Sequence, residues 1–178
     1  MYFKALTLTI LTLFSTSFYA QDYGISTVDV EKAQEAWGDG IVKIGEIYLE
    51  DGNYKEAAMK HIMNSYDYAD GSVLFKPTMA AERPFRPTAE GALSYFVGGN
   101  DKFPEDKGFA IKPWTNVRFE NHNIITYGMK GIAMGHYYFT DLKGKETKVE
   151  FTLGFLKRGD DIKITIQDSS LPFDDDSN

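Results

Sequence analysis

Cysteine is absent from the 178 residues of the chain, and positive charge is scarce. Without cysteine, the chain has no disulfide, no thiolate ligand for zinc and no cysteine nucleophile. The 19 Lys and Arg residues are outnumbered by 26 Asp and Glu residues, which gives a formal net charge of −7 at pH 7. Because no excess of positive charge attracts phosphate groups, we expect no nucleic-acid partner.

Histidine is also scarce. Its three copies, His61, His122 and His136, fall on distant segments with no closely spaced pair. Three histidines can hold zinc with an open fourth position, but such spacing does not favour a shared site. We therefore expect no metal cofactor, with zinc or manganese as the alternative. His136, in the segment GHYYFT, is either a proton carrier that reaches a pocket or a structural histidine.

Long hydrophobic runs are confined to the start of the chain. Lys4 precedes an apolar stretch over 5–14, and small residues lead up to Ala20, which is the pattern of a secretory signal peptide. The stretch is too short to span a bilayer comfortably. We expect residues 1–20 to be removed, leaving an exported protein, periplasmic or secreted, that has no membrane contact. The mature chain then comprises one domain over 21–173 and an acidic, disordered tail over 174–178.

Aromatic residues are abundant by contrast, with 13 Phe and 11 Tyr in a chain that is 43% hydrophobic. This supply suits one core in one domain. Apolar residues recur at helical spacing over 30–48 and over 54–69, and Thr88 can cap a shorter helix that ends at Val97. A short strand is expected over 72–76.

From Trp114 onward, the alternation of apolar and polar residues predicts strands, centred on VRFEN, GHYYFT, KVEFTLGFL and DIKITIQDS. Helices first and an antiparallel meander afterwards indicate an α+β fold, with three helices packed on one face of a curved sheet. This is the order of an NTF2-like, or cystatin-like, cone. The concave face and the helices of such a cone enclose a pocket, and its convex face is often used for dimerisation.

Several segments together resemble the iota class of carbonic anhydrases. The order and spacing agree from about Trp37 to Phe173. The segments that carry the resemblance are SVLFKPT (72–78), RPTAEGALSYFVGG (86–99), GFAIKPW (108–114), VRFEN (117–121), MGHYYFT (134–140), KVEFTLGF (148–155) and SSLPF (169–173).

The resemblance implies an NTF2-like fold, commonly a homodimer, that hydrates carbon dioxide to bicarbonate. It implies a pocket where hydroxyls and a histidine hold water and bicarbonate, with or without a metal. Thr78 in KPT and Tyr95 in SYFVGG match family positions. The final strand departs from the family, because its members typically end in His-His-Ser-Ser. Here Gln167 and Asp168 replace both histidines, while the two serines at 169 and 170 remain.

Strand periodicity predicts which of these four side chains face the pocket. Side chains alternate between the faces of a strand. The row of Ile162, Ile164 and Ile166 continues to Asp168 and Ser170, which we therefore expect to point inward. Gln167 and Ser169 would then point to the other face. A β-bulge near the strand end is the alternative, and it would exchange the two pairs.

The candidate catalytic residues are accordingly Thr78, Tyr95, Asp168 and Ser170. Their hydroxyls can hold a water or a bicarbonate oxygen, but Tyr, Ser and Thr are poor bases near neutral pH. An inward Asp168 becomes a useful base only if burial raises its pKa. As residues that bind or wall the substrate we single out Phe75, Phe96, Trp114, Gln167, Ser169 and His136, and Phe119 is a further candidate for the wall. Each aromatic ring, in the plainer interpretation, simply fills the core.

Three functions are consistent with this reading. The first is an exported carbonic anhydrase, with activity reduced or lost because the family histidines are missing. The second is a non-catalytic, dimeric module that binds bicarbonate or another small ligand. The third is an isomerase that uses Asp168 as a desolvated base and Tyr95 as an oxyanion donor. Arg83 and Arg86 either bind an anion at the pocket mouth or are solvated loop residues.

Overall fold

The structure, a computed structural model, describes residues 24–174. The predicted signal peptide and all but the first residue of the predicted tail lie outside this range. The elements, in chain order, are α1 (Thr27–Leu49), α2 (Tyr54–Ser65), β1 (Leu74–Lys76), α3 (Ala89–Val97), β2 (Trp114–Tyr127), β3 (Lys130–Asp141), β4 (Glu146–Arg158) and β5 (Asp161–Ser170). Within residues 24–174, no helix combines the length and hydrophobicity needed to cross a bilayer.

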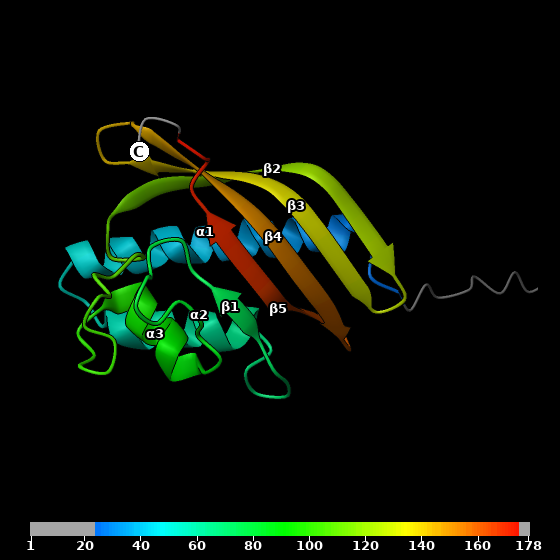
Figure 1. Ribbon diagram of the computed structural model, residues 1–178, viewed down its shortest axis with the longest axis horizontal. Coiled ribbons are helices and arrows are strands. Elements are labelled where there is room, and N and C mark those ends of the chain that lie inside the picture. Colours follow the sequence, from blue (N-terminus) through cyan, green and yellow to red (C-terminus); the bar gives the residue numbers. More distant parts are fainter. Residues whose placement is uncertain (1–23, 175–178) are drawn as a thin grey trace, which may run out of the picture.

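The long helix α1 begins at a complete capping box. Ser26 Oγ accepts a hydrogen bond from the Asp29 backbone N–H at 3.1 Å, and Asp29 Oδ2 accepts one from the Ser26 N–H at 2.9 Å. The buried face of α1 includes Trp37 and Ile41. The sheet arches over this helix, while α2 and α3 lie toward β1 and β5 (Figure 1).

Helix α2 is shorter than the sequence predicts. It ends at Ser65 rather than near residue 69, because Tyr66 becomes extended and forms a parallel bridge with Ile164 of β5. Asp67, the next residue, is buried and pairs with Arg158 at the end of β4, with Nη2 2.6 Å from Oδ2. These long-range contacts end the helix. The periodicity of the local sequence cannot predict them, because their partners lie on β4 and β5.

The sheet has the order β1-β5-β4-β3-β2. The meander of β2 to β5 is antiparallel as predicted, but β1 pairs with β5 in parallel, so the sheet is mixed. The predicted α+β fold is confirmed. One side of the sheet and the three helices enclose an aromatic core that includes Trp37, Phe96 and Tyr137.

Two helices approach closely where Gly40 of α1 faces His61 of α2. A Cβ added to Gly40 would lie 2.1 Å from His61 Nδ1. The His61 ring is itself held beside the rings of Trp37 and Phe96, with centroids at 6.3 Å and 6.1 Å. Gly40 therefore serves helix packing at the expense of helix propensity.

We expect Gly40→Ala to destabilise the protein by roughly 1–2 kcal/mol in urea unfolding, because the cost of overpacking exceeds the gain in propensity. In a His61→Ala background the same substitution should stabilise by about 0.5–1 kcal/mol, since only the propensity gain is left. Equal effects of Gly40→Ala in the two backgrounds would contradict this account of the contact.

Candidate functional site

A small inner cavity lies between the helices and the sheet. Its volume is about 10 Å³, which is close to the space that one water molecule needs. Its walls combine aromatic rings with a few polar groups. The lining residues are Trp37, Phe75, Pro77, Thr78, Tyr95, Phe96, Phe109, Tyr137, Phe139, Gln167 and Ser169.

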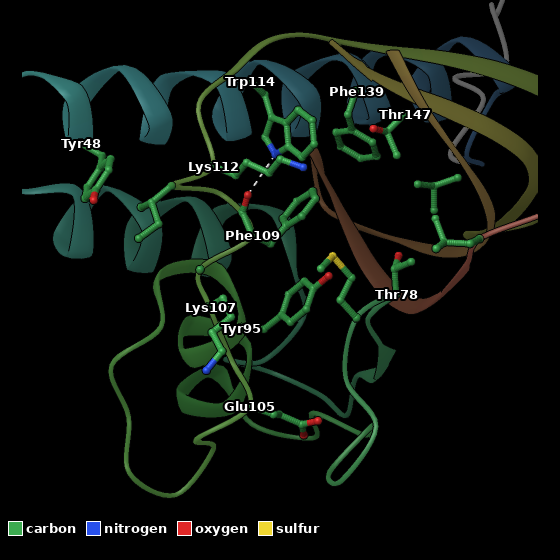
Figure 2. Close-up of a pocket in the computed structure, with 15 residues that line it drawn as sticks. Tyr48, Thr78, Tyr95, Glu105, Lys107, Phe109, Lys112, Trp114, Phe139 and Thr147 are labelled. Carbon is green, nitrogen blue, oxygen red and sulfur yellow. Dashed lines mark hydrogen bonds between the residues drawn. The ribbon is translucent and has the colours of Figure 1, made fainter. Parts of the chain in front are cut away.

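A larger outer cavity of about 390 Å³ adjoins it. The two share Thr78, Tyr95, Phe109 and Phe139 in their walls. Figure 2 shows the rings of Phe109, Trp114 and Phe139 gathered at one end of the outer cavity, with Tyr95 and Thr78 on other sides of it. The two cavities therefore adjoin at these four residues.

The end of β5 is oriented by a bulge. Gly154 of β4 pairs with Ile166 and Phe155 pairs with Ile164, so Thr165 is an extra residue and the alternation shifts by one. Gln167 and Ser169 are 3% and 2% exposed and line the inner cavity. The prediction that Asp168 and Ser170 point inward is wrong, and the alternative with a bulge is confirmed.

A chain of hydrogen bonds leads to the inner cavity from the helices. Trp37 Nε1 donates to the Tyr66 hydroxyl at 2.8 Å, and Tyr66 donates to Gln167 Oε1. Because an indole only donates, the single proton of Tyr66 is free to be donated to Gln167. The carbonyl oxygen of Gln167 is thereby held toward Tyr66, and its amide NH₂ points elsewhere.

The chain of hydrogen bonds continues on the sheet. The Gln167 amide lies close enough to the Tyr137 phenol to lower its pKa, as a hydrogen-bond donor does. Tyr137 and Ser169 share a hydrogen bond between their hydroxyls. Ser169 lowers the pKa of Tyr137 as well, so the phenol oxygen lies among several groups that can donate to it.

The tyrosines of the site are protonated at neutral pH. Burial raises the pKa of Tyr137 to about 12, although contacts with Ser169, Gln167 and Thr78 lower it. Burial also raises the pKa of Tyr66 and of Tyr95. Since amides and hydroxyls do not take up protons in this range, the inner cavity presents hydrogen-bond donors and no general base.

Thr78 and Tyr95 meet where the two cavities adjoin. The Met79 backbone and the Thr78 side chain lie close enough to Tyr95 to lower its pKa, an effect that burial outweighs. Thr78 is half-buried, and Tyr95 is 6% exposed. These two predicted residues therefore lie together with Gln167 and Ser169, whereas Asp168 and Ser170 do not.

The other face of the sheet carries the remaining candidates. His136, Asp168 and Ser170 line a shallow groove there, together with His122. Asp168 is exposed and pairs with Lys76, with Oδ1 3.0 Å from Nζ. Neither Asp168 nor His136 can act as a base inside the pocket from this face, so the interpretation of His136 as the pocket's proton carrier is wrong.

The predicted aromatic wall is divided between the cavities. Phe75 and Phe96 line the inner cavity, and Trp114 lines only the outer one. Phe119 lines neither and packs edge-to-face on Trp37 and Tyr137. Its plainer interpretation, as a core residue, is the correct one.

The proline-rich loop before α3 is fixed by its own charges. Arg86 is fully buried and pairs with Asp106, with Nη2 2.7 Å from Oδ1, so it does not bind an anion at the pocket mouth. Glu105 accepts hydrogen bonds from the backbone N–H groups of residues 81, 82 and 83 at 2.6–2.9 Å. These three bonds lower the pKa of Glu105 to about 2. The loop that carries Thr78 is therefore held in place.

Three hydrogen-bonding residues of the site were missed from the sequence, Trp37, Tyr66 and Tyr137, and so were the wall residues Pro77, Phe109 and Phe139. The first two appear there as ordinary helix-face residues. Tyr137 lies between His136 and Tyr138 in GHYYFT, so its side chain is on the opposite face of the strand from theirs. The sequence alone does not show which of the two faces is turned toward the core. No group of three His, Asp or Glu side chains is placed to hold a metal ion within residues 24–174.

His61 lies near the site without joining it. The residue is half-buried, its Nε2 is buried without a hydrogen-bond partner among the described residues, and burial lowers its pKa to about 4. The unfolded chain, with an ordinary histidine pKa of about 6.5, binds a proton at a higher pH than the folded one. The contribution of His61 to stability is therefore present above about pH 6.5 and lost as the pH falls toward 4.

We expect His61→Leu to reduce the loss of stability between pH 7 and pH 5 by about 2 kcal/mol, measured by urea unfolding at both values. His122→Asn, which changes an exposed histidine, is the matched control and should leave the pH dependence unchanged. An equal loss of stability between pH 7 and pH 5 in the two variants would contradict the lowered pKa of His61.

Comparison with known proteins agrees with this geometry. The family described as "Metal-independent carbonic anhydrase" matches residues 28–171. A curated relative, the metal-independent carbonic anhydrase of Nostoc sp., is 44% identical over 156 residues, which cover 84% of this chain and 75% of the relative.

Solved structures give the same picture. A crystal structure of an iota-carbonic anhydrase from a cyanobacterium, complexed with bicarbonate, is 39% identical and superimposes with a TM-score of 0.83 over 95% of this chain and 99% of its own. An NTF2-like protein of unknown function from Shewanella oneidensis is 14% identical, with a TM-score of 0.53 over 82% and 99% of the two chains. The second likeness concerns the fold alone and confirms the NTF2-like arrangement.

Proposed function

The chain belongs to the metal-independent carbonic anhydrase family, and we propose that it binds carbon dioxide and bicarbonate where the inner cavity adjoins the outer one, and interconverts them slowly. The observation that carries this proposal is the set of hydroxyl and amide groups that line the inner cavity, from Thr78, Tyr95, Gln167 and Ser169. They offer hydrogen-bond donors without supplying a base. The relative that was crystallised with bicarbonate supports the choice of ligand.

Bicarbonate suits the donor set. The Ser169 hydroxyl, the Gln167 amide and the Thr78 and Tyr95 hydroxyls can all donate to its oxygens, and charge-assisted hydrogen bonds of this kind are the stronger ones. The rings of Phe75, Phe96 and Phe109 complete the wall. An apolar wall of this kind accommodates carbon dioxide, which is itself apolar.

The chemical step requires that a water oxygen bond to the carbon of carbon dioxide and that the water lose a proton. A hydroxyl such as Thr78 can orient the water, but no group of the inner cavity accepts its proton at neutral pH. The proton must therefore pass to solvent through the outer cavity. Absence of a positioned base typically costs about 10²- to 10⁴-fold in rate, so we expect weak activity.

The second candidate function is a non-catalytic bicarbonate-binding module, and the same absence of a base favours it. The isomerase interpretation fails, because it requires Asp168 to act as a base inside the pocket and this side chain faces outward.

We expect Gln167→His to raise the rate of carbon dioxide hydration by about 10- to 100-fold, because it places an imidazole, with a pKa near 6.5, at the inner cavity. The rate of this variant should also rise with pH through the ionisation of the new histidine. Stopped-flow hydration assays over pH 5.5–8.5, with and without a chelator, provide the measurement.

Asp168→His is the matched control, since it introduces the same side chain one residue away on the opposite face of the sheet. We expect it to leave the rate unchanged. A gain at 168 and none at 167 would contradict the assignment of the inner cavity. If all three proteins were inactive yet broadened the ¹³C resonance of bicarbonate, the binding module would be the better description.

Export and dimer formation stay predictions. The signal pattern lies in residues 1–20, and the groove lined by His136 and Asp168 lies on the sheet face opposite the helices, the face that we expect a homodimer to use. We propose that the protein acts after export, on carbon dioxide and bicarbonate outside the cytoplasm.

A further inference from the structure

We infer that the outer cavity is a second binding site, for an organic monocarboxylate with an aromatic or medium-length acyl body. Its volume of about 390 Å³ falls in the range of roughly 300–1,000 Å³ in which small organic ligands bind. Bicarbonate has only four non-hydrogen atoms and would leave most of this space unfilled. The inference does not rest on the proposed reaction, and the two cavities share Thr78, Tyr95, Phe109 and Phe139 in their walls.

The walls of the outer cavity are suited to an apolar body. Phe109, Trp114 and Phe139 form one continuous aromatic surface, with ring centroids 5.2–5.9 Å apart. Val149 and Ile111 add aliphatic surface to the lining. Trp114 Nε1 already donates to the Phe109 carbonyl oxygen at 2.9 Å, so the indole offers its ring rather than its polar group (Figure 2).

The charges at the cavity favour an anionic ligand. Two lysines, Lys107 and Lys112, are among the lining residues, and both are exposed. Lys112 Nζ lies 4.6 Å from the centroid of the Trp114 ring, which keeps its charge beside the aromatic wall. Glu105 is the one carboxylate of the lining, and it is already bound by three backbone N–H groups.

These features indicate the orientation of the ligand. The apolar body lies against Phe109, Trp114 and Phe139, and the carboxylate lies toward Lys112 at the mouth. An alcohol of the same shape would keep the apolar contacts and lose the charge interaction. The ligand class is thus defined by an apolar body that fills the aromatic end of the outer cavity and by one negative charge.

Isothermal titration calorimetry with 4-phenylbutyrate tests the inference, and 4-phenylbutanol is the matched neutral compound. We expect 4-phenylbutyrate to bind with a Kd on the order of 1 mM or below and the alcohol to bind more weakly. Lys112→Gln should weaken binding of the acid by about two- to five-fold, the usual effect of one exposed charge pair. Lys60→Gln, which removes an exposed charge on α2, should leave it unchanged.

Variants in which a tryptophan side chain fills the outer cavity provide the decisive comparison. Thr147→Trp, at a half-buried position of the lining, should abolish binding of 4-phenylbutyrate. Leu171→Trp, at an exposed position of the same lining, serves the same purpose if the first variant does not fold. Gln167→His changes only the inner cavity and should not alter the affinity. The inference is overturned by an absence of binding at millimolar concentrations, or by binding that persists in the filled variants.

Discussion

The orientation of the Gln167 amide at the inner cavity depends on one hydrogen bond, from the Trp37 indole to the Tyr66 hydroxyl. An indole nitrogen can only donate, so Tyr66 is free to donate its own proton to Gln167 Oε1. The Gln167 NH₂ group is thereby turned toward Tyr137, whose pKa it lowers. A Tyr66 that donated elsewhere would leave the buried Gln167 oxygen without this partner, at a cost of about 1–3 kcal/mol. A residue on α1 therefore sets, through this chain of hydrogen bonds, how Gln167 is presented to the cavity.

The same chain explains how two distant parts of the sequence come to share a site. Tyr66 is the residue at which α2 ends, and it reaches the sheet through its bridge with Ile164. The bulge at Thr165 follows directly on β5 and turns Gln167 toward Tyr66. The end of the helix and the bulge thus lie side by side, and each would lose its partner without the other.

The sequence allowed much of the fold to be predicted, because the main elements have strong local periodicity. The helical spacing over 30–48, the helix that begins after Thr88 and the antiparallel meander are examples. The parallel pairing of β1 and the early end of α2 were beyond reach, since both depend on contacts with β5 far along the chain. For the site, the family resemblance identified Thr78 and Tyr95, and the structure places them together.

The end of β5 shows where sequence reasoning stops. Alternation counted from Ile162 to Ile166 assigns Asp168 to the pocket, and a single extra residue at Thr165 reverses the result. Such a bulge has no local sequence signal here, because Thr165 suits a regular strand equally well. Tyr137 was missed for a related reason, since alternation alone does not say which face of β3 is covered by helices.

The capture of Glu105 by the loop over 81–83 has a consequence for how the site responds to its surroundings. Three converging backbone N–H groups form a concave anion receptor, and here the chain supplies its own occupant. The three N–H groups of this loop therefore need no phosphate, sulfate or bicarbonate from solution as a hydrogen-bond acceptor. The conformation of residues 81–83, which follow Thr78 closely in the chain, is thus set by a carboxylate of the protein itself.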